Sequence, residues 1–421
     1  MYAPVKKGAH TKKILIGIGI AVVAFAAVFT AFRIADNLSD RRLRAELVED
    51  LDYMLAVLEE NFPHINTIYR LQGVDIFALG DNIREQVLDR GNPMSHDIFR
   101  ELLLTDFLRP TRFIGHLQLS SWRPYTPCAG TNLVTEIIEE GRIAHLRVIS
   151  MSACSASYCR TCNLIALDFY RQIIDFDHLI IDIRGNPGGF VEYFHANIAR
   201  PLIADTRLST TFTHFFKAGE YNINFLRQQI PGHFSRRQPV SLEAIDRLFG
   251  LENLEDWVIE DLMSMDYYFM TIKSVSSTPT LIGGEEWGRW RNFDGKIWTL
   301  IDGGVSSASQ EITAFYMNTG FATFVGEPTR GIAGLGGFQR LLTAGQGLTM
   351  PNTGIRVRFD STYMVDAAGH PNEYPINPHY FNRPGMDALQ TVLAMIEEGH
   401  TRAHKFAGNN VKYIERKVLT I

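Results

Sequence analysis

The spacing of apolar residues predicts that the chain begins with helices. Between Leu38 and Phe62 the apolar positions recur every three or four residues and so share one face of a helix. Asn61-Phe62-Pro63 ends this run, since proline does not continue a helix. Shorter helix-like segments fill residues 65–110. We therefore expect a small helical N-terminal module over residues 37–125.

From Leu133 the pattern changes to short apolar runs that alternate with amphipathic ones. This order is typical of βαβ units and a parallel sheet. The expected strands and helices are Arg142–Ile149 (strand), Asn163–Ile174 (helix), His178–Ile183 (strand), Lys296–Ile301 (strand), Phe321–Val325 (strand), Gln339–Thr349 and Gly354–Phe359 (strands), and Asp387–Glu397 (closing helix). We assign residues 126–405 to this α/β domain and residues 406–421 to a C-terminal tail.

Residues 201–290 interrupt the alternation and are rich in aromatic and polar residues. Three broken helices are expected there, over Tyr221–Gln229, Ser241–Leu248 and Trp257–Tyr267. We interpret this stretch as an insertion that caps the domain or controls substrate access.

An uncharged and mostly apolar run, Ile14–Phe32, lies close to the N-terminus. As a helix it spans about 28 Å, close to the hydrocarbon thickness of a membrane. Four lysines precede it (Lys6, Lys7, Lys12 and Lys13), so the positive-inside rule places residues 1–36 as a cytoplasmic tip and transmembrane anchor. The remainder is then extracytoplasmic. A cleaved signal peptide is the alternative, but its small-x-small site, Ala24-Phe25-Ala26, falls inside the apolar run.

The charge of the exported part disfavours nucleic acid as a partner. The whole chain of 421 residues has a formal net charge of −5, of which residues 1–36 contribute +4, so the rest carries −9. Its composition, 46% hydrophobic and 21% charged, is that of a globular protein with a large core.

All four cysteines lie in the exported part, which favours two disulfides. They are Cys128, Cys154, Cys159 and Cys162. The C-x4-C-x2-C spacing also matches a plant-type iron–sulfur ligand set, but the fourth cysteine lies upstream rather than downstream.

Candidate chemistry gathers around Ser307. This serine, with Ser306 and Ser309, lies between a glycine turn and an expected helix. Such a serine is often an ordinary N-cap, but the free N–H groups of the first turn can also stabilise an oxyanion beside an exposed hydroxyl. A second glycine turn, Arg184–Gly189, follows the strand ending at Ile183, and a lone His116 follows the helical module.

In this order, the motifs resemble those of the S41 serine peptidases, which include the carboxyl-terminal processing (tail-specific) proteases and the tricorn core protease. The resemblance covers roughly residues 45–400. The matching segments are Asp50–Met54, Leu58–Pro63, Gly115-His116, Ile181–Gly189, Ser307-Ala308-Ser309, Gly326–Gly331 and Asn372–Pro378. It implies a crotonase-like (ClpP/crotonase-type) α/β fold of stacked sheets, behind the helical module and the transmembrane helix.

The resemblance also implies the catalytic residues. Ser307 matches the nucleophile. The tail-specific branch uses a lysine where this chain has Ile332, and no lysine occurs between Lys296 and Lys405. The tricorn-like branch uses Ser-His-Glu, with His116 as base and Glu373 orienting it. Gly188 or Gly189, with Ala308, would form the oxyanion hole. Neither a metal nor a cofactor is required, and the substrate would be a peptide or protein.

Two departures keep a second function open. Gln310 stands where the family has an acid, and Ile114 replaces the aspartate before Gly-His. A catalytically inactive binding protein on the same scaffold is therefore the alternative. Between His116 and Arg142 there is also too little chain for a PDZ domain. A homo-oligomer is compatible with this sequence.

Overall fold

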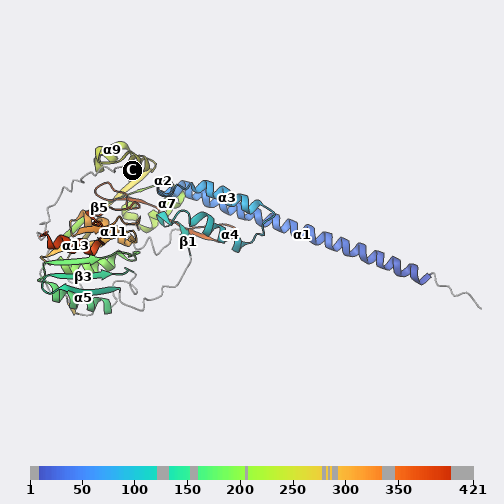
Figure 1. Ribbon diagram of the computed structural model, residues 1–421. Coiled ribbons are helices and arrows are strands. Elements are labelled where there is room, and N and C mark those ends of the chain that lie inside the picture. The colour runs from blue at the N-terminus through green and yellow to red at the C-terminus, as the bar shows by residue number, and fades with distance from the viewer. Residues whose placement is uncertain are drawn as a thin grey trace, which may run out of the picture.

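The computed structural model describes most of the chain, with several gaps (Figure 1). The described residues are 9–120, 132–151, 160–203, 207–276, 281–282, 285–286, 293–333 and 347–399. Side chains near the ends of these ranges, including most of residues 9–35 and residues 160–164, lie outside the described part.

A six-stranded sheet forms the centre of the α/β domain. Its strand order is β17-β12-β10-β4-β3-β2, and all neighbours are parallel except β2 and β3. The bounds are β2 (Leu133–Glu139), β3 (Ile143–Val148), β4 (His178–Asp182), β10 (Lys296–Ile301), β12 (Thr323–Gly326) and β17 (Tyr380–Phe381). The strands expected at 142–149, 178–183, 296–301 and 321–325 are thus confirmed.

Helices cover both faces of this sheet. One face packs Leu179 and Ile181 with α5 (Arg160–Ile173), α6 (Val191–Phe194), η3 (His195–Ala199), η4 (Arg200–Leu202) and α11 (Ala308–Asn318) in the largest apolar core. The alternate residues, among them Ile180 and Leu300, pack with α13 (Ala388–Glu397) in a second core. Because successive strand residues point to opposite faces, the continuous apolar runs of β4 and β10 serve both cores.

The helical module packs on a small sheet from much later in the chain. The module comprises α1 (Ala9–Asn61), α2 (Ile65–Gln72), α3 (Ile76–Leu88), α4 (His96–Leu102), η1 (Leu103–Leu108) and η2 (Ile114–His116). Its core includes Leu348, Met350, Val357 and Phe359. These belong to or flank β14 (Gly347–Thr349) and β15 (Arg356–Arg358), which form a three-stranded sheet with β1 (Gln118–Leu119). Strands expected in the α/β domain therefore complete the N-terminal module.

The inserted stretch contains the three expected helices and also a sheet that the sequence did not reveal. The helices are α7 (Glu220–Gln229), α9 (Leu242–Phe249) and α10 (Asp256–Met263), with α8 (Pro231–Phe234) and η5 (Leu251–Asn253) between them. The sheet, which we call the inserted sheet, has the order β16-β5-β7-β6. Its strands are β5 (Arg207–Phe216), β6 (Gln238–Pro239), β7 (Tyr267–Ser276) and β16 (Tyr363–Val365). Long antiparallel pairing of β5 with β7 holds it together.

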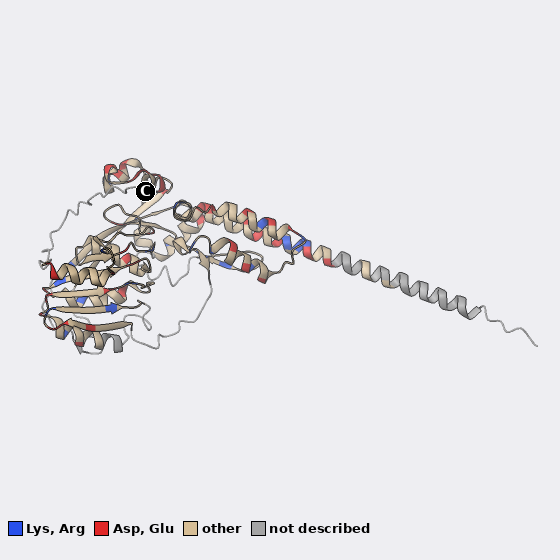
Figure 2. Cartoon of the chain, viewed as in Figure 1, with Lys and Arg blue, Asp and Glu red and all other residues tan. Residues whose placement is uncertain are grey.

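Helix α1 extends well beyond the module, and its N-terminal half projects from the body of the molecule (Figure 1). Acidic and basic residues mix along its C-terminal half (Figure 2), where Arg42–Glu46 and Arg44–Asp40 form ion pairs at 2.9 and 2.8 Å. Within the described residues, we find no helical stretch with the length and apolar character needed to span a membrane. The side chains of most of Ile14–Phe32 are outside those residues.

The predicted disulfides cannot be compared with the structure. Cys128, Cys154 and Cys159 lie outside the described residues, as does the side chain of Cys162 on α5. The same holds for the alternative iron–sulfur site.

Candidate active site

Ser307 lies at the end of a two-residue strand and at the N-cap of α11. The strand β11 (Ser306–Ser307) pairs in parallel with β13 (Gly331–Ala333). The backbone of Ser307 has φ 56° and ψ −125°, a conformation that non-glycine residues seldom adopt. Its side chain does not cap the helix. A strained serine whose hydroxyl is not used as a cap fits the nucleophile interpretation better than the ordinary N-cap.

His116 reaches Ser307 from the helical module. Its Nε2 lies 3.4 Å from Ser307 Oγ, a long contact of the kind that tightens when substrate binds. The backbone leading to it runs through left-handed conformations, with Gly115 at φ 60° and His116 at φ 49°. At Gly115 a Cβ would lie 2.5 Å from the His64 ring and 2.6 Å from the Phe62 ring, so only glycine fits this close approach. The Gly-His pair is therefore set by backbone geometry.

Asp360 is the carboxylate that contacts the imidazole. Its Oδ2 lies 2.7 Å from His116 Nδ1, and its backbone N–H donates to the Gly115 carbonyl at 2.8 Å. The reason is strand register: β1 and β15 pair antiparallel with Gln118 opposite Arg358, which brings the residue two before Gln118 next to the residue two after Arg358. Asp360 is only 3% exposed, so water screens this contact little.

Glu373, expected to orient His116, contacts the backbone beside it instead. Its Oε2 accepts the Gly115 N–H at 3.1 Å. The position expected for Glu373 is corrected in this respect, since the carboxylate that accepts from His116 Nδ1 is that of Asp360. Glu373 still acts on the histidine electrostatically. Burial lowers the pKa of His116, but Asp360 and then Glu373 outweigh it, so the pKa is raised above its ordinary value of 6.5.

The glycine turn lies against the nucleophile, as expected. A Cβ at Gly188 would approach Ser307 Cβ and Ala308 N to 2.8 Å. The Gly188 N–H, however, donates to Asn186 Oδ1 at 2.9 Å. Ala308 is the first residue of α11, where N–H groups lack an acceptor within the helix. Of the three predicted oxyanion-hole donors, Gly189 and Ala308 therefore fit better than Gly188, whose role is close packing.

Asn186 joins the two sides of the site, and sequence analysis did not identify it. Its Oδ1 also accepts the Ser309 hydroxyl at 2.7 Å, and its Nδ2 donates to the Val148 carbonyl at 2.8 Å. Asn186 and Ser309 are both fully buried. The second serine of the Ser-Ala-Ser motif thus fixes the glycine turn against the start of α11. In the sequence, the only indication of this role for Ser309 was that it lies two residues after Ser307.

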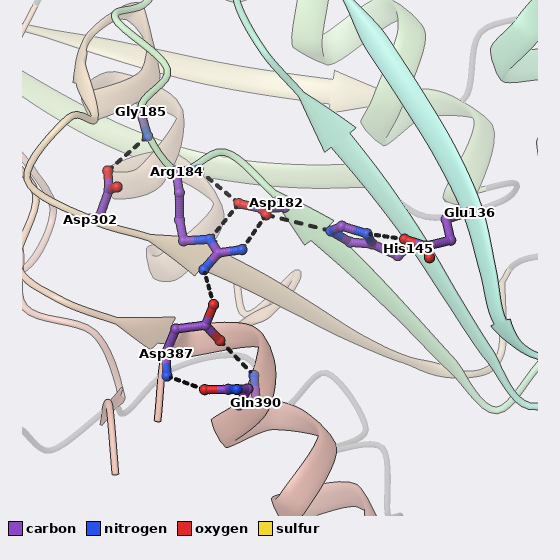
Figure 3. A network of polar contacts seen from close by, with 8 residues as sticks. All are labelled: Glu136, His145, Asp182, Arg184, Gly185, Asp302, Asp387 and Gln390. Atoms are coloured by element: carbon purple, nitrogen blue, oxygen red, sulfur yellow. Dashed lines mark hydrogen bonds and ion pairs between the residues drawn. The ribbon is translucent and has the colours of Figure 1, made fainter. Parts of the chain in front are cut away.

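A polar network holds the same turn to the sheet (Figure 3). The guanidinium of Arg184 donates to Asp182 at 2.7 Å and to Asp387 at 3.1 Å, and Asp387 caps α13. His145 lies between Asp182 and Glu136, at 3.5 and 3.3 Å. Burial raises the pKa of Asp182, but hydrogen bonds from His145 and Arg184 outweigh this and hold it far below its usual range. The network is structural, since it anchors the strand end from which the turn departs.

One group of side chains near the histidine has the composition of a metal site. His64, Asp360 and Glu373 each place one donor atom within 4.8 Å of the others. Both carboxylates are already engaged, by His116 and by Gly115, and His64 contacts the Thr362 carbonyl through Nε2 at 3.1 Å. Burial also lowers the pKa of His64 to about 4, which keeps it neutral. These contacts explain why the three side chains lie together: they pack around His116 and its backbone.

The departures at Gln310 and Ile332 have local explanations. Gln310 is buried, and its Nε2 donates to the Tyr374 carbonyl at 2.9 Å, next to Glu373. Ile332 adopts φ 60° in β13, and its N–H donates to the Glu373 carbonyl at 3.2 Å. Both residues therefore connect the Glu373 segment to the elements that flank Ser307.

A serine hydroxyl, an imidazole and a buried carboxylate in series, on an α/β scaffold with a glycine turn, define the class of serine hydrolases. The sequence model of Peptidase family S41 matches residues 142–380, more than half of the chain. The chain belongs to this family and is a serine peptidase. No curated protein matches it.

Solved structures share the fold at low sequence identity. A candidate peptidase from Parabacteroides merdae is 16% identical, with a TM-score of 0.50 over 85% of this chain and 96% of that one. A serine-to-alanine mutant of CPAF is 11% identical, with a TM-score of 0.51 over 87% of this chain and 100% of that one. The expected α/β fold with stacked sheets and helices is thus confirmed.

Proposed function

We propose that this protein is a membrane-anchored, extracytoplasmic serine endopeptidase that acts through Ser307, His116 and Asp360. The observation that carries the proposal is the series of contacts from Ser307 Oγ to His116 Nε2 and from His116 Nδ1 to Asp360 Oδ2, at 3.4 and 2.7 Å. Asp360 takes the orienting role that the family resemblance suggested for Glu373. Glu373 holds the Gly115 amide and adds negative charge beside the imidazole.

The reaction follows from these positions. His116 accepts the proton of Ser307 as the hydroxyl oxygen attacks the peptide carbonyl. The N–H groups of Gly189 and Ala308 stabilise the oxyanion. The protonated imidazole, held by Asp360, then gives its proton to the leaving amine. Water, deprotonated by the same histidine, hydrolyses the acyl-enzyme and restores Ser307.

The location rests on the sequence. The apolar run Ile14–Phe32 and the four lysines before it support an anchor with a cytoplasmic N-terminus. Helix α1 includes this run and also the first part of the helical module, so the proposed anchor would be continuous with the first helix of the module. To test this, protease is added to intact cells and to lysed cells carrying the full chain. Digestion of residues 37–421 in intact cells supports the proposal, whereas protection of these residues until the cells are lysed contradicts it.

The catalytic assignment is tested with a fluorophosphonate probe on the purified full chain. Wild type should be labelled, and Ser307→Ala and His116→Ala should not. Ser274→Ala, at an exposed serine of β7, serves as the matched control and should label like wild type. Labelling that persists in the Ser307→Ala variant would refute the assignment. No labelling of wild type would favour a catalytically inactive binding protein on the same scaffold.

A further inference from the structure

A buried ion pair connects the inserted sheet to the helix that carries the nucleophile. Lys273 of β7 pairs through Nζ with Glu311 Oε1 of α11. The Glu311 side chain is 1% exposed and that of Lys273 is 14% exposed. The lysine comes from the inserted region and the glutamate from the α/β domain, so this contact spans two parts of the fold.

Glu311 lies one helical turn after Ser307 along α11. Ser307 is the N-cap of α11 and Glu311 follows four residues later, which corresponds to about 6 Å along the helix axis. The oxyanion of the reaction forms at the same helix end, where free N–H groups provide positive potential. An uncompensated carboxylate at Glu311 would oppose that potential.

Lys273 is the cation that pairs with Glu311. Burial lowers the pKa of Lys273 to about 7, and the neighbouring carboxylate favours its charged form. Arg200, the other cation that acts on His195, pairs with Glu192 at 2.8 Å. Two histidines lie close enough for Lys273 to affect their pKa, but both are neutral at physiological pH. Burial first, and Lys273 second, lower the pKa of His195 and of His214 to about 3. His195 Nδ1 contacts the Tyr316 hydroxyl at 2.6 Å, and His214 contacts Thr271 at 3.1 Å.

The inserted sheet also holds the other end of the same helix. Asn318, the last residue of α11, donates to Asp366 Oδ2 at 3.0 Å, and Asp366 directly follows β16. The placement of α11 is therefore linked to the inserted sheet at both ends.

We infer that Lys273 is a positioning residue for catalysis, which neutralises Glu311 so that the start of α11 can stabilise the oxyanion at Ser307. The inserted sheet then contributes to the chemical step itself, in addition to any effect on substrate access. The inference rests on the proposed role of Ser307 as nucleophile.

The test measures the rate of fluorophosphonate labelling, because the phosphonylated serine places an oxygen where the oxyanion forms. Lys273→Met keeps the length and volume of the side chain but removes the cation beside Glu311. Because a buried carboxylate without a cation tends to bind a proton, labelling is followed from about pH 7 to about pH 9. We expect its maximal labelling rate to fall roughly 10- to 100-fold where Glu311 is ionised, with the half-saturating probe concentration unchanged, as expected for a charge about one helical turn along α11 in a medium of intermediate dielectric. Glu311→Gln should label within about threefold of wild type, since an isolated buried lysine can lose its proton.

The decisive variant is Lys273→Met/Glu311→Gln, which removes both charges. Recovery to within about threefold of wild type supports the electrostatic role. A double variant that labels as slowly as Lys273→Met would show that the pair only holds the two parts together and would overturn the inference. Lys217→Met is the matched control, because Lys217 contacts the Glu59 carbonyl of α1 instead of α11. Should Lys273→Met fail to fold, Lys273→Gln takes its place, because it removes the charge but can still hydrogen-bond to Glu311, and the same loss is expected.

Failure of this inference is distinguishable from failure of the proposed function. If wild type is not labelled, the role of Ser307 as nucleophile is refuted, and the proposed function and the inference about Lys273 are both withdrawn. Wild type that is labelled, together with Lys273→Met labelled at the same rate, refutes only the role of Lys273.

Discussion

Asp360 and His116 lie 2.7 Å apart although 244 residues separate them in the chain. Antiparallel pairing of β1 with β15 brings them together, because the residues just outside the paired strands continue the same register. His116 and Asp360 therefore both lie beside the sheet that completes the helical module, whereas Ser307 belongs to the α/β domain.

Replacing the two carboxylates near His116 should have unequal effects. Asp360→Asn removes the negative charge that stabilises the imidazolium, and we expect labelling to fall roughly 10²–10⁴-fold, as for an orienting aspartate in a serine triad. Glu373→Gln keeps an acceptor for the Gly115 N–H and should cost about tenfold or less. Labelling rates of the two variants check this. If Glu373→Gln loses more of the labelling rate than Asp360→Asn does, Glu373 and not Asp360 orients His116.

The pH dependence of labelling should report the raised pKa of His116. Only the neutral imidazole accepts the serine proton, so the rate rises with pH and is half-maximal above about 6.5. In Asp360→Asn the protonated form loses its main partner, and the midpoint should move to lower pH. A wild-type profile that is flat between about pH 5 and pH 8 would contradict the role of His116.

Gly188→Ala should disable the site through sterics. The added Cβ would lie 2.7 Å from the Ser306 carbonyl and 2.8 Å from Ser307 Cβ, at a backbone φ of 98°. We expect a loss of at least about 10²-fold in labelling, comparable to removal of an oxyanion-hole donor. Gly141→Ala is the matched control, since its φ is 68° and its Cβ would meet nothing within 4 Å. This control should lose only about 1 kcal/mol of stability and keep its activity. Equal losses in the two variants would argue against close packing at Gly188.

Stability should depend on Asp182 in a pH window set by its lowered pKa. The unfolded carboxyl titrates near 4 and the folded one well below that. The stabilisation by its ionised form is therefore present above about pH 4 and lost as the pH falls further. Asp182→Asn should lower the free energy of unfolding by about 3 kcal/mol at pH 7, because it leaves Arg184 and His145 without their buried anion.

Denaturant titrations of wild type and Asp182→Asn at pH 7 and at about pH 3 check this prediction. The difference between the two proteins should shrink at the lower pH. A difference that stays constant would show that the network in Figure 3 contributes through packing rather than through charge.

The sequence by itself determined the local elements and the residues that approach the reacting bond. Apolar runs such as β4 and β10 were predictable because continuous burial on both faces leaves a local pattern. The Gly188-Gly189 turn stood out because paired glycines after a strand allow a close backbone approach, whereas the roles of Ser307 and His116 came from the family resemblance.

Only the tertiary structure decided which distant side chains complete the site. Asp360 and Lys273 have no local signature, because a lone polar residue after a strand or in an insertion looks like any exposed one. Asn186 lies within the glycine turn that the sequence indicated, but its contact with Ser309 was not predictable. Their roles arise from strand register and from the packing of segments far apart in the chain, which hydrophobic periodicity does not encode. The same limit explains why the long pairing of β5 with β7 was missed while the helices between them were found.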